Sequence, residues 1–222
     1  MSSQSQLFQP LQIRGVSLPN RLVISPMCQY SADDGLANDW HLAHLGKLAQ
    51  GGAAVVFTEA VAVQRRGRIT HGDLGIWADA QAQALAGIAR FISSMGSVPA
   101  IQLAHAGRKA SMQRPWHGNG PLDDSDRARG DEPWPVVGPS AIALGEGWLV
   151  PSEMTQAEIA QVVEDFAAAA RRADNAGFGI AEVHAAHGYL AASFLSPISN
   201  HRTDIYGGDR AGRSRMLLET AE

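Results

Sequence analysis

The fold of this chain is decided by the stretch Asp39-Trp-His-Leu-Ala-His-Leu-Gly-Lys-Leu-Ala-Gln-Gly-Gly-Ala-Ala-Val-Val-Phe-Thr58. Its first part follows a helical pattern, and the pair Gly51-Gly52 is a suitable C-cap because glycine adopts the conformations that end a helix. The apolar run from Ala53 to Thr58 is typical of a strand that is buried on both faces. The stretch therefore predicts a helix followed directly by a buried parallel strand.

The same order of helix, glycine and strand repeats along the chain. A helix is predicted over residues 79 to 94, and a strand over residues 98 to 103. A second pair follows, with a helix over 155 to 177 that opens on a capping-box spacing and a strand over 179 to 184. A further strand, over 21 to 27, precedes the first helix. Since parallel strands need long crossovers, this alternation predicts a parallel sheet with helices outside it, either a barrel or a doubly wound sheet.

We expect residues 1 to 222 to form a single α/β domain. The first twenty residues, with turn signals at Gly15 and Pro19-Asn20, predict a small hairpin. Residues 104 to 153 form a loop of a length that is usually functional or disordered, and a functional loop is favoured here. Four strands are visible, whereas a complete (β/α)8 barrel has eight strands and about 250 residues. A partial barrel is therefore expected.

Composition excludes several classes of protein. The chain is 45% hydrophobic and 18% charged with a formal net charge of -4, which is ordinary for a globular protein and offers no basic surface to nucleic acid. The single cysteine rules out an intrachain disulfide and fits a cytoplasmic protein. No apolar run approaches the roughly 18 residues of a membrane span. The common dinucleotide, Walker A, nucleophile-elbow and zinc-protease motifs are absent from the sequence.

Reactive side chains gather at the predicted carboxyl ends of the strands, where parallel α/β proteins place their active sites. His184 and His187 follow the fourth strand, and two imidazoles this close in sequence can converge on one oxygen atom or one metal ion. Tyr189 comes next. Its phenol has an ordinary pKa near ~10, so it is protonated at neutral pH and can act as a general acid. This group is the strongest candidate for chemistry.

The remaining candidates have a structural explanation beside the functional one. Cys28 follows the first strand, where it is either a small buried residue or part of the site. His41 and His44 lie within the first predicted helix, and packing or solvent exposure accounts for them. Tyr189 itself has an alternative as a half-buried packing residue.

Five segments resemble the Old Yellow Enzyme family of flavin ene-reductases in order and spacing. They are residues 20 to 30 (NRLVISPMCQY), 51 to 63 (GGAAVVFTEAVAV), 102 to 110 (QLAHAGRKA), 184 to 190 (HAAHGYL) and 196 to 208 (SPISNHRTDIYGG). The match spans most of the chain and is closest to the bacterial branch that includes xenobiotic reductases, where a cysteine follows the Pro-Met pair. The resemblance implies a (β/α)8 TIM barrel, of which about four strand-helix units are present.

The resemblance also implies a cofactor site. FMN would lie across the mouth of the barrel, with NADPH or NADH as its reductant. The residues implied to contact FMN are Ser25, Pro26, Met27 and Cys28 against the flavin, Ala60 near its reactive edge, and Gln102 at its pyrimidine ring. Cys28 would also tune the flavin potential. The family's arginine on the fifth strand and its phosphate-binding loops near strands seven and eight have no counterpart in these 222 residues.

The implied substrate is a small enone or nitro compound with an activated C=C bond. The residues implied to bind it are Tyr30, His184, Ala185, Ala186 and His187. The two histidines would donate hydrogen bonds to the carbonyl or nitro oxygen, as the donors of an oxyanion hole do. Tyr189 would protonate the α-carbon after hydride from flavin N5 reaches the β-carbon, which makes Tyr189, His184, His187 and Cys28 the implied catalytic residues.

Two other interpretations stay open. A metal-dependent barrel hydrolase or lyase would use His184, His187 and Glu182, since strand alternation places Glu182 and His184 on the same side. The chain would otherwise be an inactive half-barrel or interaction module, because four strands without closure leave two unpaired edges. Residues 1 to 222 alone are not expected to form a competent reductase. The full-length protein is expected to be a homo-oligomer that binds neither nucleic acid nor membrane.

Overall fold

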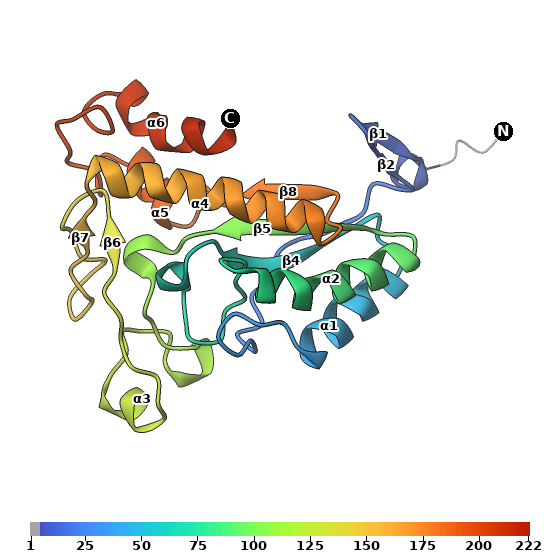
Figure 1. The fold of residues 1–222 in the computed structure, drawn as a ribbon, viewed down its shortest axis with the longest axis horizontal. Coiled ribbons are helices and arrows are strands. Elements are labelled where there is room, and N and C mark those ends of the chain that lie inside the picture. The colour runs from blue at the N-terminus through green and yellow to red at the C-terminus, as the bar shows by residue number, and fades with distance from the viewer. Residues whose placement is uncertain (1–4) are drawn as a thin grey trace.

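The computed structural model describes residues 5–222 and is built around one parallel sheet (Figure 1). The sheet consists of β3 (Val23–Ile24), β4 (Val55–Ala62), β5 (Val98–Ala104) and β8 (Ile180–Val183). The strand order is β3–β4–β5–β8, and all neighbouring pairs are parallel. Within the described residues β3 and β8 are the two edges, so the sheet is open there. The predicted parallel α/β fold is confirmed.

Three helices lie along one face of the sheet (Figure 1). They are α1 (Asp39–Gln50), α2 (Asp79–Ser94) and α4 (Gln156–Asn175). The predicted capping box of α4 is present, because Thr155 and Glu158 exchange hydrogen bonds between side chain and backbone. The main core between helices and sheet includes Leu85, Ile101, Leu103, Val162 and Phe166. In the described part of the chain, no helix combines the length and the apolarity needed to cross a membrane.

Two strands differ in extent from the prediction. The strand predicted over residues 21 to 27 is paired only at Val23 and Ile24, since Pro26 lacks the N–H that would continue the ladder. The strand predicted over residues 53 to 58 continues to Ala62 as β4. It contains a bulge, because Phe57 pairs with Ala100 and Ala60 pairs with Gln102, which leaves one extra residue on β4. The short helix η2 (Arg65–Gly67) follows β4.

The segment between β5 and α4 is folded rather than an open loop. It contains η3 (Gly107–Lys109), η4 (Pro115–His117), α3 (Asp124–Ala128), β6 (Val137–Gly138) and β7 (Ser152–Glu153). Figure 1 shows α3, β6 and β7 at the end of the molecule that lies opposite the hairpin of β1 and β2. The side chain of Asp126 is buried in this segment and accepts a hydrogen bond from Gln113 at 2.7 Å. Hydrogen bonds to this buried carboxylate thus help to hold the segment folded, together with apolar residues such as Val136 that pack in the cluster of buried residues at the strand ends.

The chain continues after β8 with α5 (Leu190–Leu195) and α6 (Arg210–Ala221). The buried guanidinium of Arg202 anchors the connection between these two helices. It binds the Asp204 carboxylate and also donates to the carbonyl oxygens of Pro139 and Met154. The connection is thereby fastened to the segment that carries β6 and β7.

A small antiparallel hairpin lies at the opposite end of the sheet (Figure 1). It is formed by β1 (Leu11–Ile13) and β2 (Val16–Leu18), and η1 (Gln6–Phe8) precedes it. Leu18 is buried in a cluster with Ala54, Val55 and Ala100, which seals the amino-terminal ends of the strands. Of the twenty residues predicted for this hairpin, residues 1–4 lie outside the described part of the chain.

Candidate active site

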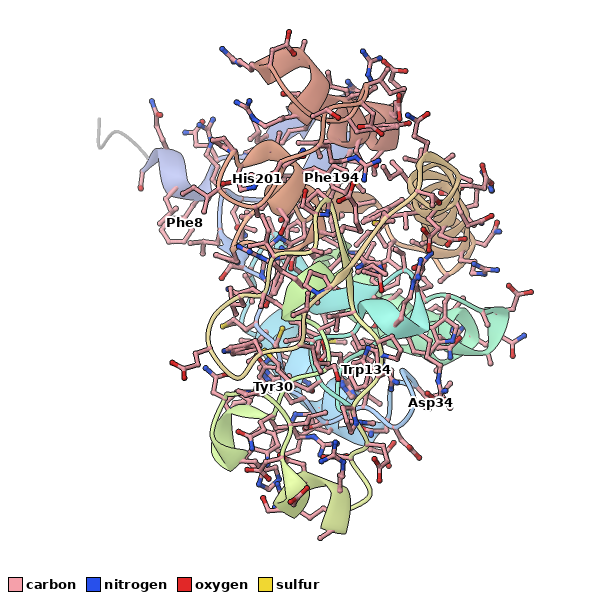
Figure 2. The ribbon with its side chains drawn as sticks, turned by 90° about the vertical axis from the view of Figure 1, so that its left-hand side faces the viewer. Phe8, Tyr30, Asp34, Trp134, Phe194 and His201 are labelled. Atoms are coloured by element: carbon pink, nitrogen blue, oxygen red, sulfur yellow. The ribbon has the colours of Figure 1, made fainter. Side chains whose placement is uncertain are left out.

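The carboxyl ends of the strands meet at the end of the molecule that Figure 2 faces, where Tyr30 is labelled. Ala60 on β4 pairs with Gln102 on β5, and Gln102 pairs with Glu182 on β8. Cys28, which lies beyond β3, packs against the same buried cluster as Ala60, and so does Tyr189 from the loop after β8. Four segments that are far apart in the sequence are thus brought together.

A cavity of about 290 Å³ opens beside this cluster. It is lined by Tyr30, Ile69, Lys109, Met112, Asn119, Leu144, Trp148 and Tyr189. Aromatic and apolar side chains with a few polar groups are the usual lining of a small-molecule site. Most of the lining residues come from the segment between β5 and α4, so that segment forms a wall of the cavity.

His184, His187 and Tyr189 converge at the end of β8. His187 Nδ1 lies 3.3 Å from His184 Nε2, and the ring centres of His184 and Tyr189 are 4.8 Å apart. The N–H of Ala186 donates to His184 Nδ1 at 3.2 Å, which leaves the hydrogen of a neutral ring on Nε2. Burial, and secondly the neighbouring His187, lowers the pKa of His184, so this ring is neutral at pH 7.

Lys109 connects the loop after β5 to the loop after β8. Its Nζ donates to the carbonyl oxygen of His187 at 2.7 Å and lies 5.7 Å from the ring centre of Tyr189. His187 has a left-handed backbone with φ of 56°, which is uncommon for a residue other than glycine. Lys109 therefore holds an unusual turn in place. Sequence analysis assigned no role to Lys109, because nothing in its spacing shows that it reaches a turn almost eighty residues away.

The thiol and the two phenols of the site are protonated at neutral pH. Burial, with a smaller effect from the carboxylates of Asp73 and Glu59, raises the pKa of Cys28 to about 12. Burial also raises the pKa of Tyr30 and of Tyr189. Tyr189 thus meets the first requirement of a proton donor, which is to hold its proton until the reaction needs it.

The residues expected to hold a flavin lie at or just beyond the carboxyl ends of β3, β4 and β5. Met27 presents an apolar side chain that is 45% exposed at the end of β3, next to Ser25 and Pro26. The small side chain of Ala60 lies beside the amide of Gln102, whose Nε2 donates to Glu182 Oε1 at 2.7 Å. A flat heteroaromatic ring would find here an apolar surface to cover and an amide to bind.

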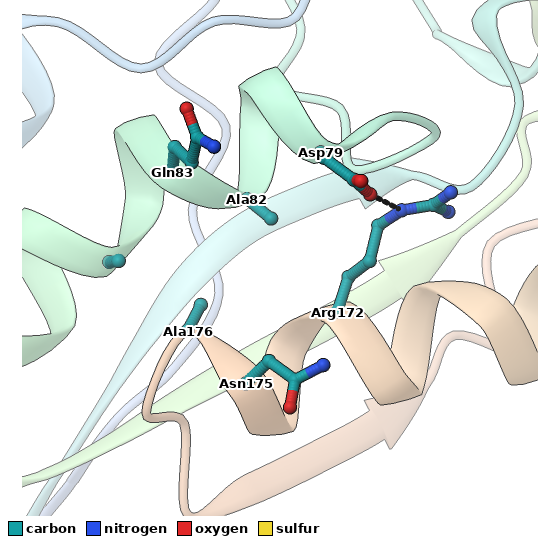
Figure 3. A pocket seen from close by; sticks show the side chains of 7 residues that line it. Asp79, Ala82, Gln83, Arg172, Asn175 and Ala176 are labelled. Atoms are coloured by element: carbon teal, nitrogen blue, oxygen red, sulfur yellow. Dashed lines mark hydrogen bonds and ion pairs between the residues drawn. The ribbon is translucent and has the colours of Figure 1, made fainter.

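Other features of the surface do not belong to this site. A hollow between α2 and α4, shown in Figure 3, is lined by Asp79, Ala82, Gln83, Ala86, Arg172, Asn175 and Ala176. It is crossed by an ion pair in which Arg172 Nε lies 2.8 Å from Asp79 Oδ1. None of these residues follows a strand end. Across residues 5–222, no group of three or more His, Cys, Asp and Glu side chains is arranged to hold a metal ion.

Comparisons with known proteins show the family of the chain. Residues 6–222 match the NADH:flavin oxidoreductase / NADH oxidase family. The chain belongs to this family. It is 48% identical over 219 residues to an NADH:flavin oxidoreductase of Gibberella zeae, covering 98% of this chain and 52% of that protein. It is 45% identical over 217 residues to an NADPH dehydrogenase of Listeria welshimeri, covering 97% of this chain and 58% of the relative.

Solved structures of family members have the same fold. Morphinone reductase superposes with a TM-score of 0.83 at 30% identity, over 99% of this chain and 58% of that one. Old Yellow Enzyme from Pichia sp. AKU4542 gives a TM-score of 0.83 at 30% identity, over 98% and 55% of the two chains. The four strand-helix units are therefore part of a (β/α)8 TIM barrel, as the sequence resemblance implied. The chain spans little more than half the length of these relatives.

Family membership settles the cofactor class that the sequence left to resemblance. FMN is the cofactor and NADH or NADPH the reductant of proteins of this kind, so the expectation of a flavin oxidoreductase is confirmed for the family. The metal-dependent hydrolase considered from Glu182, His184 and His187 has no support among the relatives described above. In the structure Glu182 binds Gln102 instead.

Proposed function

We propose that this protein is an FMN-dependent NAD(P)H oxidoreductase that reduces C=C bonds activated by a carbonyl or nitro group. The observation that carries the proposal is the convergence of His184, His187 and Tyr189 at the end of β8, where Tyr189 lines the cavity and packs against the cluster that contains Ala60. FMN, when bound, supplies the hydride that the β-carbon of the substrate receives.

The two histidines bind the oxygen of the substrate. His184 is neutral and carries its hydrogen on Nε2, so it is a donor, and His187 lies within 3.3 Å of that atom. Hydrogen bonds from these two rings to the carbonyl or nitro oxygen would stabilise the negative charge that grows there as the β-carbon receives hydride. The backbone of Ala185 and Ala186 sets the direction of both rings, since it forms the turn between them.

Tyr189 delivers the proton that completes the reduction. Its phenol is protonated because burial raises its pKa, and its ring is a neighbour of both Lys109 and His184. The hydride brings two electrons to the β-carbon, and the phenolic proton then passes to the α-carbon and is replaced from water. The C=C bond is thus converted to CH–CH with one hydride and one proton.

Residues at the ends of β3, β4 and β5 hold the cofactor. Ser25, Pro26 and Met27 form a surface for the flavin, and Ala60 leaves room at the reactive edge. Gln102 contributes hydrogen bonds from its amide. Cys28 and Tyr30 close the site on the side of β3, where Cys28 packs against the cluster of Ala60 and Tyr30 lines the cavity.

The substitution Tyr189→Phe tests this assignment. Flavin reduction by NADPH should be nearly unchanged, since it needs no proton from Tyr189, whereas reoxidation by an enone should slow by about 100-fold or more. Stopped-flow absorbance of the flavin measures the two half-reactions separately. Tyr206→Phe is the matched control, because Tyr206 donates to Glu219 and belongs neither to the cavity lining nor to the strand-end cluster, so both rates should stay unchanged. Equal slowing of both half-reactions by Tyr189→Phe would refute the acid role.

A further inference from the structure

A buried carboxylate at the bulge of β4 holds the backbone that leads to Tyr30. The side chain of Glu59 is only 1% exposed, and its Oε2 accepts the backbone N–H of Gln29 at 3.1 Å. Gln29 lies between Cys28 and Tyr30, the two residues that close the site on the side of β3. A buried, charged acceptor makes stronger hydrogen bonds than a neutral one, so this contact is well suited to fix a loop.

His41 fixes the orientation of that carboxylate. Its Nε2 lies 3.3 Å from Glu59 Oε1, and both atoms are buried without another hydrogen-bond partner within residues 5–222. The backbone N–H of Asn38 donates to His41 Nδ1 at 3.1 Å, as part of the cap of α1. His41 Nδ1 also lies 3.0 Å from Asn38 Oδ1, so Nδ1 is occupied by the cap of α1 and Nε2 is the ring atom that faces Glu59. The start of α1, the strand β4 and the segment after β3 are thereby joined through two side chains.

The other end of the same segment is held by a second loop. The N–H of Ala32 donates to the carbonyl oxygen of Gly72 at 2.8 Å, and a side chain at Gly72 would collide with the backbone of Tyr30. This loop is itself organised by Asp73, whose carboxylate accepts hydrogen bonds from Ile69 and Thr70. Tyr30 has a left-handed backbone with φ of 52° between these two attachments, so the contacts on both sides maintain an uncommon conformation.

We propose that Glu59, oriented by His41, is a positioning residue that holds the Cys28–Tyr30 segment against the substrate pocket. That this pocket binds a substrate rests on the function proposed above. The contacts of Glu59 themselves do not depend on any ligand. Glu59 touches neither the cavity nor the strand-end cluster. It acts through the Gln29 N–H.

Besides holding the backbone of Gln29, the charge of Glu59 raises the pKa of neighbouring groups. The groups that face this region are His41 from α1, Asp73 from the loop after η2, and Cys28 and Tyr30 from the segment after β3. Both carboxylates raise the pKa of Cys28, after the larger effect of burial. Burial, and secondly the charge of Glu59, raises the pKa of Asp73 to about 7. The thiol beside the flavin site is therefore kept neutral by its surroundings.

The single cysteine allows a test that needs no flavin chemistry. Cys28 is the only thiol in the chain, so its rate of reaction with methyl methanethiosulfonate at pH 8 reports on this segment alone. Glu59→Leu removes the acceptor and the charge, and it should raise the rate by about tenfold or more, because the segment opens and the thiolate fraction grows. Glu59→Gln keeps an oxygen for the Gln29 N–H, and its rate should lie between those of the wild type and Glu59→Leu. Asp204→Asn, which removes a partnered carboxylate elsewhere, should leave the rate unchanged.

Amide hydrogen exchange gives a second measurement that holds even if Glu59→Leu fails to fold. In the wild-type protein the Gln29 amide should exchange at least about 100-fold more slowly than a free loop amide. In Glu59→Gln, Gln29 should lose part of this protection, while Ala32, held by Gly72, should keep its own. Unprotected Gln29 in the wild type would overturn the proposal, and so would a thiol rate in Asp204→Asn as high as in Glu59→Leu.

Phenol binding to the FMN-loaded protein links the segment to the pocket. The change in the visible flavin spectrum should show weaker phenol binding in Glu59→Leu, with partial rescue in Glu59→Gln. Normal phenol binding in Glu59→Leu together with a fast thiol would show that the segment moves without affecting the pocket, which refutes the positioning role. A wild-type protein that has the length of its relatives and binds no FMN would contradict the proposed function, while the thiol and exchange measurements would still decide the role of Glu59.

Discussion

Replacing Asp204 by asparagine tests the anchor that fastens the connection between α5 and α6. Arg202 Nε lies 2.9 Å from Asp204 Oδ1, and Arg202 Nη2 lies 2.6 Å from Asp204 Oδ2. The Arg202 side chain is 5% exposed and that of Asp204 is 27% exposed, so solvent screens the pair only in part. Gln156 and the backbone N–H of Tyr206 complete the surroundings of the carboxylate.

The magnitude follows from the titration of Asp204. Hydrogen bonding to the Arg202 guanidinium is the largest cause that lowers its pKa, from the ordinary 3.8 to about 2. A change of one in pKa corresponds to about 1.4 kcal/mol, so the folded state gains roughly 2 kcal/mol when the carboxylate is ionised. A lowered pKa means that this stability is present above pH 3.8 and is lost as the pH falls through 2. Asp204→Asn should therefore reduce the free energy of unfolding by about 2 kcal/mol at pH 7 and by almost nothing at pH 2.

Urea unfolding followed by circular dichroism at pH 7 and at pH 2 measures both values. The control is Asp79→Asn, which breaks the exposed pair with Arg172 seen in Figure 3 and should cost less than about 0.5 kcal/mol at pH 7. A loss for Asp204→Asn that is as small as for Asp79→Asn would refute the reasoning. A loss that is equally large at pH 2 would show that the effect does not come from the charge.

The remaining predictions concern the site. Replacing His184 and His187 together by alanine should weaken phenol binding and slow alkene reduction by about 2 to 4 kcal/mol in activation free energy, and normal phenol binding would contradict the donor role. Cys28→Ala should shift the FMN reduction potential without loss of fold, as spectroelectrochemistry would show, while an unchanged potential would make Cys28 a packing residue. Lys109→Met should slow enone reduction more than flavin reduction by NADPH in stopped-flow experiments, because the turn at His187 loses the hydrogen bond from Lys109. Equal slowing of both steps would show a general loss of structure instead.

The layout of helices and strands could be predicted because it depends on local patterns. α2 begins and ends at the predicted residues 79 and 94, since its apolar spacing and the following Gly96 leave little freedom. The prediction of β3 was too long because an apolar run does not show where a neighbouring strand stops pairing. The prediction of β4 was too short because alternation cannot anticipate a bulge, whose extra residue is visible only against the partner strand.

In the candidate site too, residues that follow one strand end could be predicted, whereas residues that act through tertiary contacts could not. His184, His187 and Tyr189 could be singled out because they stand within six residues of one strand end. Glu59 could not be singled out, because its role depends on a hydrogen bond to the backbone thirty residues earlier. The spacing of side chains in a sequence does not show which backbone groups they bind. His41 was attributed either to packing or to a solvent-exposed face, from its helical position. Its burial agrees with that interpretation, while its contact with Glu59 comes from tertiary structure that sequence periodicity does not encode.

The bulge in β4 decides which side chain lies next to Gln102. Pairing places Phe57 and Ala60 on the face of Ala100 and Gln102, whereas uninterrupted alternation from Phe57 would place Glu59 there. One inserted residue thus exchanges a carboxylate for a methyl group at the proposed reactive edge. A carboxylate in that position would repel the negative charge that a flavin acquires on reduction, and it would occupy space the ring needs. Any redesign of β4 must therefore preserve this bulge as well as the composition of the strand. Regular pairing onward from Phe57 would place the carboxylate of Glu59, instead of the methyl group of Ala60, next to Gln102.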